Sequence, residues 1–184
     1  MAFELSQAQN ENMEYSKVAS EDPSYHAIKV FNAIEDSLWE QLDLLGNSGT
    51  MANIIHIAKE VRVLLLRADK VWNEIQKAVD VQASGLKIKA TSFSYSKEFS
   101  NYAAELMDCI KVSLDANFLA VNGSLTEQKE ALEYLELSPQ ERLNWTAKKV
   151  EKTILDATEK WGDLAAEINF TMPINIKDTR DPFL

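Results

Sequence analysis

The chain has 184 residues, a length typical of one domain with a sizeable hydrophobic core. Apolar residues make up 46% of the chain, and five glycines and four prolines are too few for a turn-rich all-β fold, so the composition favours an all-α protein. The formal net charge of −10 repels phosphate backbones and anionic lipid headgroups, which argues against nucleic-acid partners and against electrostatic docking to membranes.

Cysteine content and hydropathy bear on the compartment. Cys109 is the only cysteine, so an intrachain disulfide cannot form and a cysteine-based zinc site lacks ligands. The first residues have no basic stretch followed by an apolar one, as a secretory signal would. The uncharged stretch 44–58 contains two glycines and is shorter than the roughly 20 apolar residues of a membrane span. We therefore expect a soluble cytoplasmic protein.

The first 50 residues hold nine acids against two bases. Within them, residues 1–22 are polar and form no sustained apolar stripe, which predicts a flexible acidic arm. Apolar residues recur every three or four positions over 24–45, which predicts a helix. The following stretch 46–49, Gly-Asn-Ser-Gly, is typical of a turn, and Thr50 after it is a suitable helix N-cap.

The middle of the chain contains two further predicted helices, over 51–84 and 96–121. Between them, residues 86–90 alternate between apolar and basic, a pattern typical of a short strand. The helix over 96–121 is expected to bury a less regular stripe, which consists of Phe99, Ala103, Leu106, Ile110 and Leu114.

Two capping boxes divide the last third of the chain. Ser124 with Glu127 predicts a short helix over 125–137, and Ser138 with Glu141 opens a long helix over 139–169. A second short alternation follows at 170–176 as a candidate strand partner for 86–90, within an extended tail over 170–184. The predicted fold is an elongated antiparallel bundle of about four long helices and one short helix, which form one domain over 23–169.

The helices over 51–84 and 139–169 have the same apolar seam, with spacings that alternate between four and three residues. This spacing keeps one stripe against partner helices in a left-handed bundle. Trp72 and Trp161 occupy equivalent positions and are expected to fill one thick layer of the core. The first seam is Ile54, Ala58, Val61, Leu65, Ala68, Trp72, Ile75 and Val79, and the second is Leu143, Ala147, Val150, Ile154, Ala157, Trp161, Leu164 and Ile168.

A constant offset of 89 residues superposes the two seams, including the order of large and small side chains. The other two long helices do not align convincingly at that offset. An internal duplication explains the match. Convergence is the alternative explanation, because layers of small and large residues must interdigitate in any bundle.

Candidate chemistry is sparse. His56 and Glu60 share a helix face as half of a metal site, but neither His56 nor His26 has a glutamate three residues before it, as di-iron bundles require. Cys109 adjoins Ile110 on an apolar face and is expected to fill the core. The sequence has no phosphate-binding glycine loop or hydrolase elbow. We therefore assign no catalytic, cofactor-binding or metal-binding residue and no cofactor.

Three functions fit these observations. The first is a non-catalytic bundle that acts through protein–protein association, as a scaffold, adaptor, structural subunit or homo-oligomer. The second is a membrane-active or lipid-binding bundle that rearranges to expose apolar faces, although the charge and the lack of an insertion segment disfavour membranes. The third is an enzyme or small-ligand carrier with a site between helices.

Overall fold

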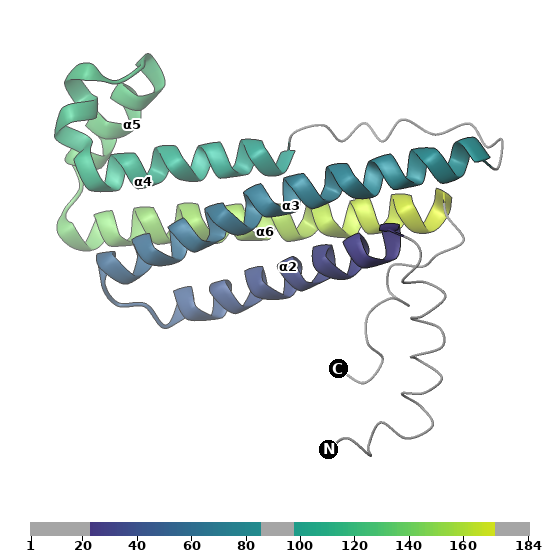
Figure 1. The fold of residues 1–184 in the computed structure, drawn as a ribbon. Helices are drawn as coiled ribbons and strands as arrows, with labels where there is room; N and C mark the ends of the chain where they lie inside the picture. The colour runs from purple at the N-terminus through teal and green to yellow at the C-terminus, as the bar shows by residue number, and fades with distance from the viewer. Residues whose placement is uncertain (1–22, 86–97, 172–184) are drawn as a thin grey trace.

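The computed structural model describes the backbone of residues 23–85 and 98–171, which form five helices within these ranges (Figure 1). The all-α prediction is confirmed. The helices are α2 (Pro23–Gly46), α3 (Met51–Gly85), α4 (Glu98–Asn122), α5 (Leu125–Leu135) and α6 (Pro139–Thr171).

The predicted boundaries differ from the structure mainly at the end of α6. The expected strand over 170–176 is wrong in its first two residues, because α6 continues through Phe170 to Thr171. Because no proline or glycine lies between Gly162 and Pro173, nothing in the sequence stops the helix at residue 169. The rest of that segment, the alternating residues 86–90 and the predicted arm over 1–22 lie outside the described residues.

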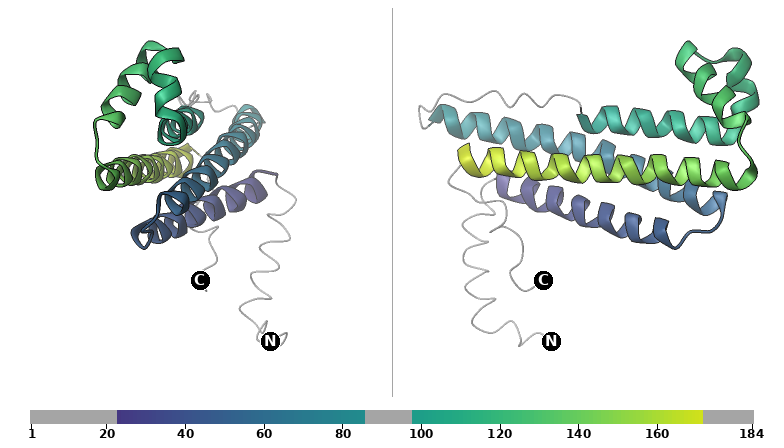
Figure 2. Two further views of the ribbon diagram at one scale, coloured as in Figure 1. Left: turned by 90° about the vertical axis from the view of Figure 1, so that its left-hand side faces the viewer. Right: turned by 180° about the vertical axis from the view of Figure 1, so that it is seen from behind.

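Four of the helices lie side by side along one long axis, and α5 stands at one end of them (Figures 1 and 2). Helices that follow one another along the bundle run antiparallel, so α3 and α6 point in the same direction (Figure 1). These two helices contact each other, and both contact α2 and α4. The two helices that share the sequence seam therefore form the centre of the bundle.

The predicted seams of α3 and α6 are the core of this bundle. All seam residues of α3 from Ile54 to Ile75 are buried, and so are those of α6 from Val150 to Leu164. Leu143 and Ala147 pack against the same core from the start of α6 and are partly buried. The helix α2 adds a third buried stripe, which includes Ile28, Phe31, Ile34 and Leu38.

One aromatic layer joins all four long helices, and it confirms that the two tryptophans share a layer. The ring of Phe31 in α2 lies 5.5 Å from Trp72 of α3 and stacks on Trp161 of α6 at 4.4 Å. Phe99 of α4 lies 4.5 Å from Trp161 and 5.9 Å from Phe31. All four side chains are at most 1% exposed.

The aromatic layer also aligns the two outer helices. Phe31 of α2 and Phe99 of α4 occupy equivalent places although they lie 68 positions apart, whereas the equivalent tryptophans lie 89 positions apart. The spacing of 68 also aligns Leu38 with Leu106, both of which are buried. The hairpin of α4 and α6 thus matches that of α2 and α3, except for 21 additional residues at its corner. A duplicated hairpin that gained residues at one corner would have this organisation.

Candidate interaction surface

The 21 additional residues lie within a small structure at the end of the bundle, which we call the corner lobe (residues 115–137). Helix α4 is interrupted at Asp115, whose φ of −148° and ψ of 49° are not helical, and the chain then leaves the bundle axis. It turns at Gly123 into α5 and returns to the start of α6 (Figure 2). The other hairpin connects α2 to α3 through residues 47–50 alone.

Capping boxes predicted from the sequence form at the starts of α5 and α6, within the lobe and directly after it. Ser124 accepts a hydrogen bond from the Glu127 amide at 3.2 Å, and the Glu127 carboxylate accepts one from the Ser124 amide at 3.4 Å, which confirms the first capping box. The second box is confirmed by equivalent bonds between Ser138 and Glu141. Arg142 donates to the carbonyls of Tyr134 and Leu135, so it satisfies acceptors that the end of α5 leaves open.

The lobe has its own small core, separate from the core of the bundle. Its buried members are Val112, Ala116, Leu119, Ala131 and Tyr134. Trp145 of α6 packs beside them, with its ring 5.2 Å from the ring of Tyr134. This cluster contains few large side chains, so it covers only the inner side of α5 and of the last turns of α4.

Polar contacts join α4 to α6 next to the lobe and connect the lobe to α4. The hydroxyl of Ser113 in α4 lies 2.9 Å from that of Thr146 in α6. The Tyr134 hydroxyl donates to the Ser113 carbonyl at 3.5 Å. Cys109 lies one helical turn before Ser113, and burial raises the pKa of its thiol to about 11, so it is protonated at neutral pH. The prediction that Cys109 is a core residue is confirmed.

The outer side of the lobe is apolar and exposed. Among the described residues, ten large apolar side chains are exposed, and five of them lie between positions 114 and 132. The prediction that Leu114 is buried is therefore wrong. It is 59% exposed, because the interruption at Asp115 ends the straight part of α4 that packs on the bundle. The five residues are Leu114, Phe118, Val121, Leu125 and Leu132.

A groove lies between α4 and the start of α5 on this surface, with a volume of about 490 Å³. This volume falls within the range of ligand clefts, about 300–1,000 Å³. However, Leu114 and Phe118 in its wall remain more than half exposed, so the groove is open rather than enclosing. Its lining is Lys111, Leu114, Asp115, Phe118, Leu119, Asn122, Gly123, Ser124 and Glu127.

The rim of the groove is mainly acidic. Asp115 and Glu127 line it together with one base, Lys111. Asp108 lies one helical turn before Lys111 in α4. Its carboxyl has a raised pKa, first because of partial burial and then because of the negative charge of Glu127, whereas Lys111 acts in the opposite direction. The carboxylate of Glu127, which lines the groove, therefore repels that of Asp108, which does not line it. The whole corner lobe has five acids and one base.

The histidines named from the sequence do not form a site. His26 in α2 and His56 in α3 are both exposed, and Glu60 is exposed beside His56. No three histidine, cysteine or acidic side chains gather as metal ligands within residues 23–85 and 98–171.

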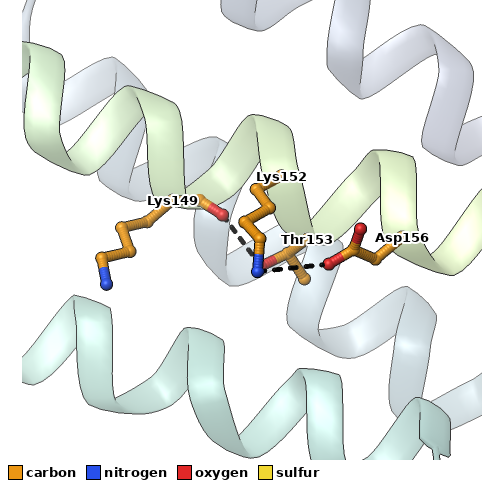
Figure 3. A network of polar contacts seen from close by, with 4 residues as sticks. All are labelled: Lys149, Lys152, Thr153 and Asp156. Carbon is orange, nitrogen blue, oxygen red and sulfur yellow. Dashed lines mark hydrogen bonds and ion pairs between the residues drawn. The ribbon is translucent and has the colours of Figure 1, made fainter.

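A group of polar contacts on α6 forms within that helix (Figure 3). The buried hydroxyl of Thr153 donates to the Lys149 carbonyl at 2.8 Å, which satisfies it within the helix. Lys152 and Asp156 form an exposed ion pair with an N–O distance of 3.6 Å. Such a pair contributes at most about 1 kcal/mol.

Sequence reasoning missed the exposed surface of the lobe, although a signal was present. Leu114, Phe118, Val121 and Leu125 follow each other at spacings of four, three and four residues, like the buried seams. Spacing alone cannot distinguish a stripe that faces its own bundle from one that faces outward.

None of the helices in the described ranges is long and apolar enough to cross a membrane. Comparison with protein-family models, with curated proteins and with solved structures finds no match for this chain.

Proposed function

We propose that this protein acts through association with another polypeptide, and that the corner lobe is its docking surface. One observation carries the proposal: of the ten exposed large apolar side chains among the described residues, four lie on the lobe and a fifth, Leu114, directly precedes it. Leu114 and Phe118 line an open groove there. Exposed apolar side chains that gather on one part of a protein surface are typical of an interaction site.

The organisation of the two hairpins supports this choice of surface. The α2–α3 hairpin closes through a short turn, so residues 115–137 are not needed to connect two antiparallel helices. The lobe has few buried residues of its own and leaves Phe118 and Leu125 in solvent, at a cost in hydration that burial against a partner would recover. The open shape of the groove suits a polypeptide better than a small molecule, which clefts usually enclose on most sides.

A photo-crosslinking residue at position 118 tests the proposal directly. Position 63 is a matched control, because Val63 is 56% exposed, as Phe118 is, but lies on α3 in the bundle. We expect discrete crosslinks to one polypeptide, or to a second copy, from position 118 and not from position 63. The double variant Leu114→Ser/Leu125→Ser should abolish them. Equal crosslinking at both positions, or none at either, would contradict the proposal.

A further inference from the structure

The chemistry of the groove specifies the partner more narrowly, on the assumption that the lobe is a docking surface. We propose that the groove binds a basic amphipathic helix of a partner protein. The apolar side of that helix packs on Leu114, Phe118 and Leu119, and its lysine or arginine side chains face Asp108, Asp115 and Glu127.

The apolar part of the groove fits one side of a helix. Leu114 and Phe118 lie four positions apart, on either side of the interruption at Asp115, and both line the groove together with the buried Leu119. An amphipathic helix presents apolar residues at intervals of three and four positions, so its apolar side can contact these side chains. The exposed side chains of Val121 and Leu125 extend the contact beyond the groove.

The charges on the rim decide the sign of the partner. Asp115 and Glu127 face the groove from two helices, and Asp108 lies close enough to Glu127 to be affected by its charge. Lys111 compensates only one of these three carboxylates. A cation from the partner between Asp108 and Glu127 would replace a repulsion by two attractions.

The same charges disfavour the other occupants. Two copies of the lobe placed face to face would bring the carboxylates of both rims together, at a cost from like charges. Anionic lipid headgroups would meet the same repulsion. Lys111 is the one cation that lines the groove, against two carboxylates, and Lys129 of the lobe does not line it.

The test uses the full-length protein and three synthetic peptides of equal length. The first is a helix with leucines at heptad spacing and flanking lysines, the second has glutamate at every lysine position, and the third is a scramble of the first. Binding is measured by titration calorimetry at low and high salt, and the contact is located by amide chemical shifts. We expect only the lysine peptide to bind, with the shifts concentrated in residues 108–127.

A charge-neutral variant sharpens this test. Asp108→Asn/Asp115→Asn/Glu127→Gln removes the rim charges, and glutamine at 127 can retain the capping box. It should weaken the lysine peptide by about tenfold, which corresponds to about 1.4 kcal/mol, and should remove most of the salt dependence. The control is Asp36→Asn/Glu40→Gln/Asp43→Asn, which removes three exposed charges from α2 and should leave the affinity unchanged.

Several outcomes would overturn the inference. Equal affinity of the lysine and glutamate peptides would contradict the role of charge, and absence of any peptide binding would contradict a helical partner. In both cases the proposed function survives if position 118 still crosslinks to a polypeptide or if the protein dimerises through the lobe. If the lobe instead binds liposomes of neutral lipid and no polypeptide, both the inference and the proposed function are wrong.

Discussion

The bundle and the corner lobe use the same kinds of apolar residue in opposite ways. In the bundle, stripes with three- and four-residue spacing from four helices meet in one core, whose aromatic layer is almost completely shielded from solvent. In the lobe, apolar residues with the same spacing, such as Phe118 and Leu125, are exposed, and the buried cluster is small. The comparison shows that apolar periodicity produces a core only where other helices cover it.

The difference follows from geometry. Each long helix contacts at least two others along its length, so a stripe on its inner side is surrounded. The lobe is formed by two short helical segments beside the start of α6, and these segments can cover only one side of each other. Small units bury a lower fraction of their surface. The bundle therefore provides stability, and the lobe provides a surface.

The largest effect that would test this comparison is expected in the aromatic layer. Trp161→Ala should lower the free energy of unfolding by about 3–5 kcal/mol, because it removes the ring that contacts both Phe31 and Phe99. Trp39→Ala, at a site that is 44% exposed, should cost about 1 kcal/mol or less. Urea unfolding followed by circular dichroism measures both. If Trp161→Ala does not fold, Trp161→Phe should show a smaller loss, and equal costs at positions 161 and 39 would contradict the assignment of the core.

Substitution of one glycine in each region is expected to change stability in opposite directions. A Cβ atom on Gly123 would lie 2.6 Å from the Leu119 carbonyl oxygen and 2.8 Å from the Glu127 Cβ, so Gly123→Ala should destabilise the lobe by about 1–3 kcal/mol. A Cβ on Gly162 of α6 meets nothing within 4 Å, so Gly162→Ala should stabilise the bundle by about 0.5–1 kcal/mol. Amide hydrogen exchange locates the changes. Effects of the same sign would contradict the close turn at Gly123.

The junction between lobe and bundle should respond to acid. Hydrogen bonds from Ser138, first from its side chain and then from its backbone, lower the pKa of Glu141. A carboxyl whose pKa is lower in the folded state stabilises that state above its unfolded pKa, and this contribution is lost as the pH falls through its folded pKa. Ser138→Ala should therefore destabilise the protein at neutral pH by less than Gly123→Ala, and the difference from wild type should shrink in acid. A pH-independent difference in urea unfolding would contradict this origin.

The smallest expected effect concerns the rate at which the Cys109 thiol is chemically modified. Because burial raises the pKa of this thiol to about 11, a disulfide reagent at pH 8 should react with the folded protein at least about a hundredfold more slowly than with the unfolded chain. Cys109 lies beside the lobe junction, so Gly123→Ala should increase the rate if local opening exposes it. Rapid labelling of the folded wild-type protein would contradict its burial.

The sequence by itself determined the helices and most of the core. Local rules predict the seams of α3 and α6 and the two capping boxes, because the residues that define a helix face or a cap lie within a few positions of one another. The shared layer of Trp72 and Trp161 follows from their equivalent positions in the two seams. The end of α6 was misplaced by a few residues because a short alternation resembled a strand.

Only the tertiary structure decided which stripes are covered. The seam at Leu114 and Phe118 has the same spacing as the buried seams, but the non-helical backbone at Asp115 directs the chain away from the other helices. The equivalence of Phe31 and Phe99 likewise required the structure, because it shows that the lobe accounts for the 21-residue difference between the two hairpins. Burial depends on contacts between segments far apart in the chain, and spacing within one helix does not contain that information.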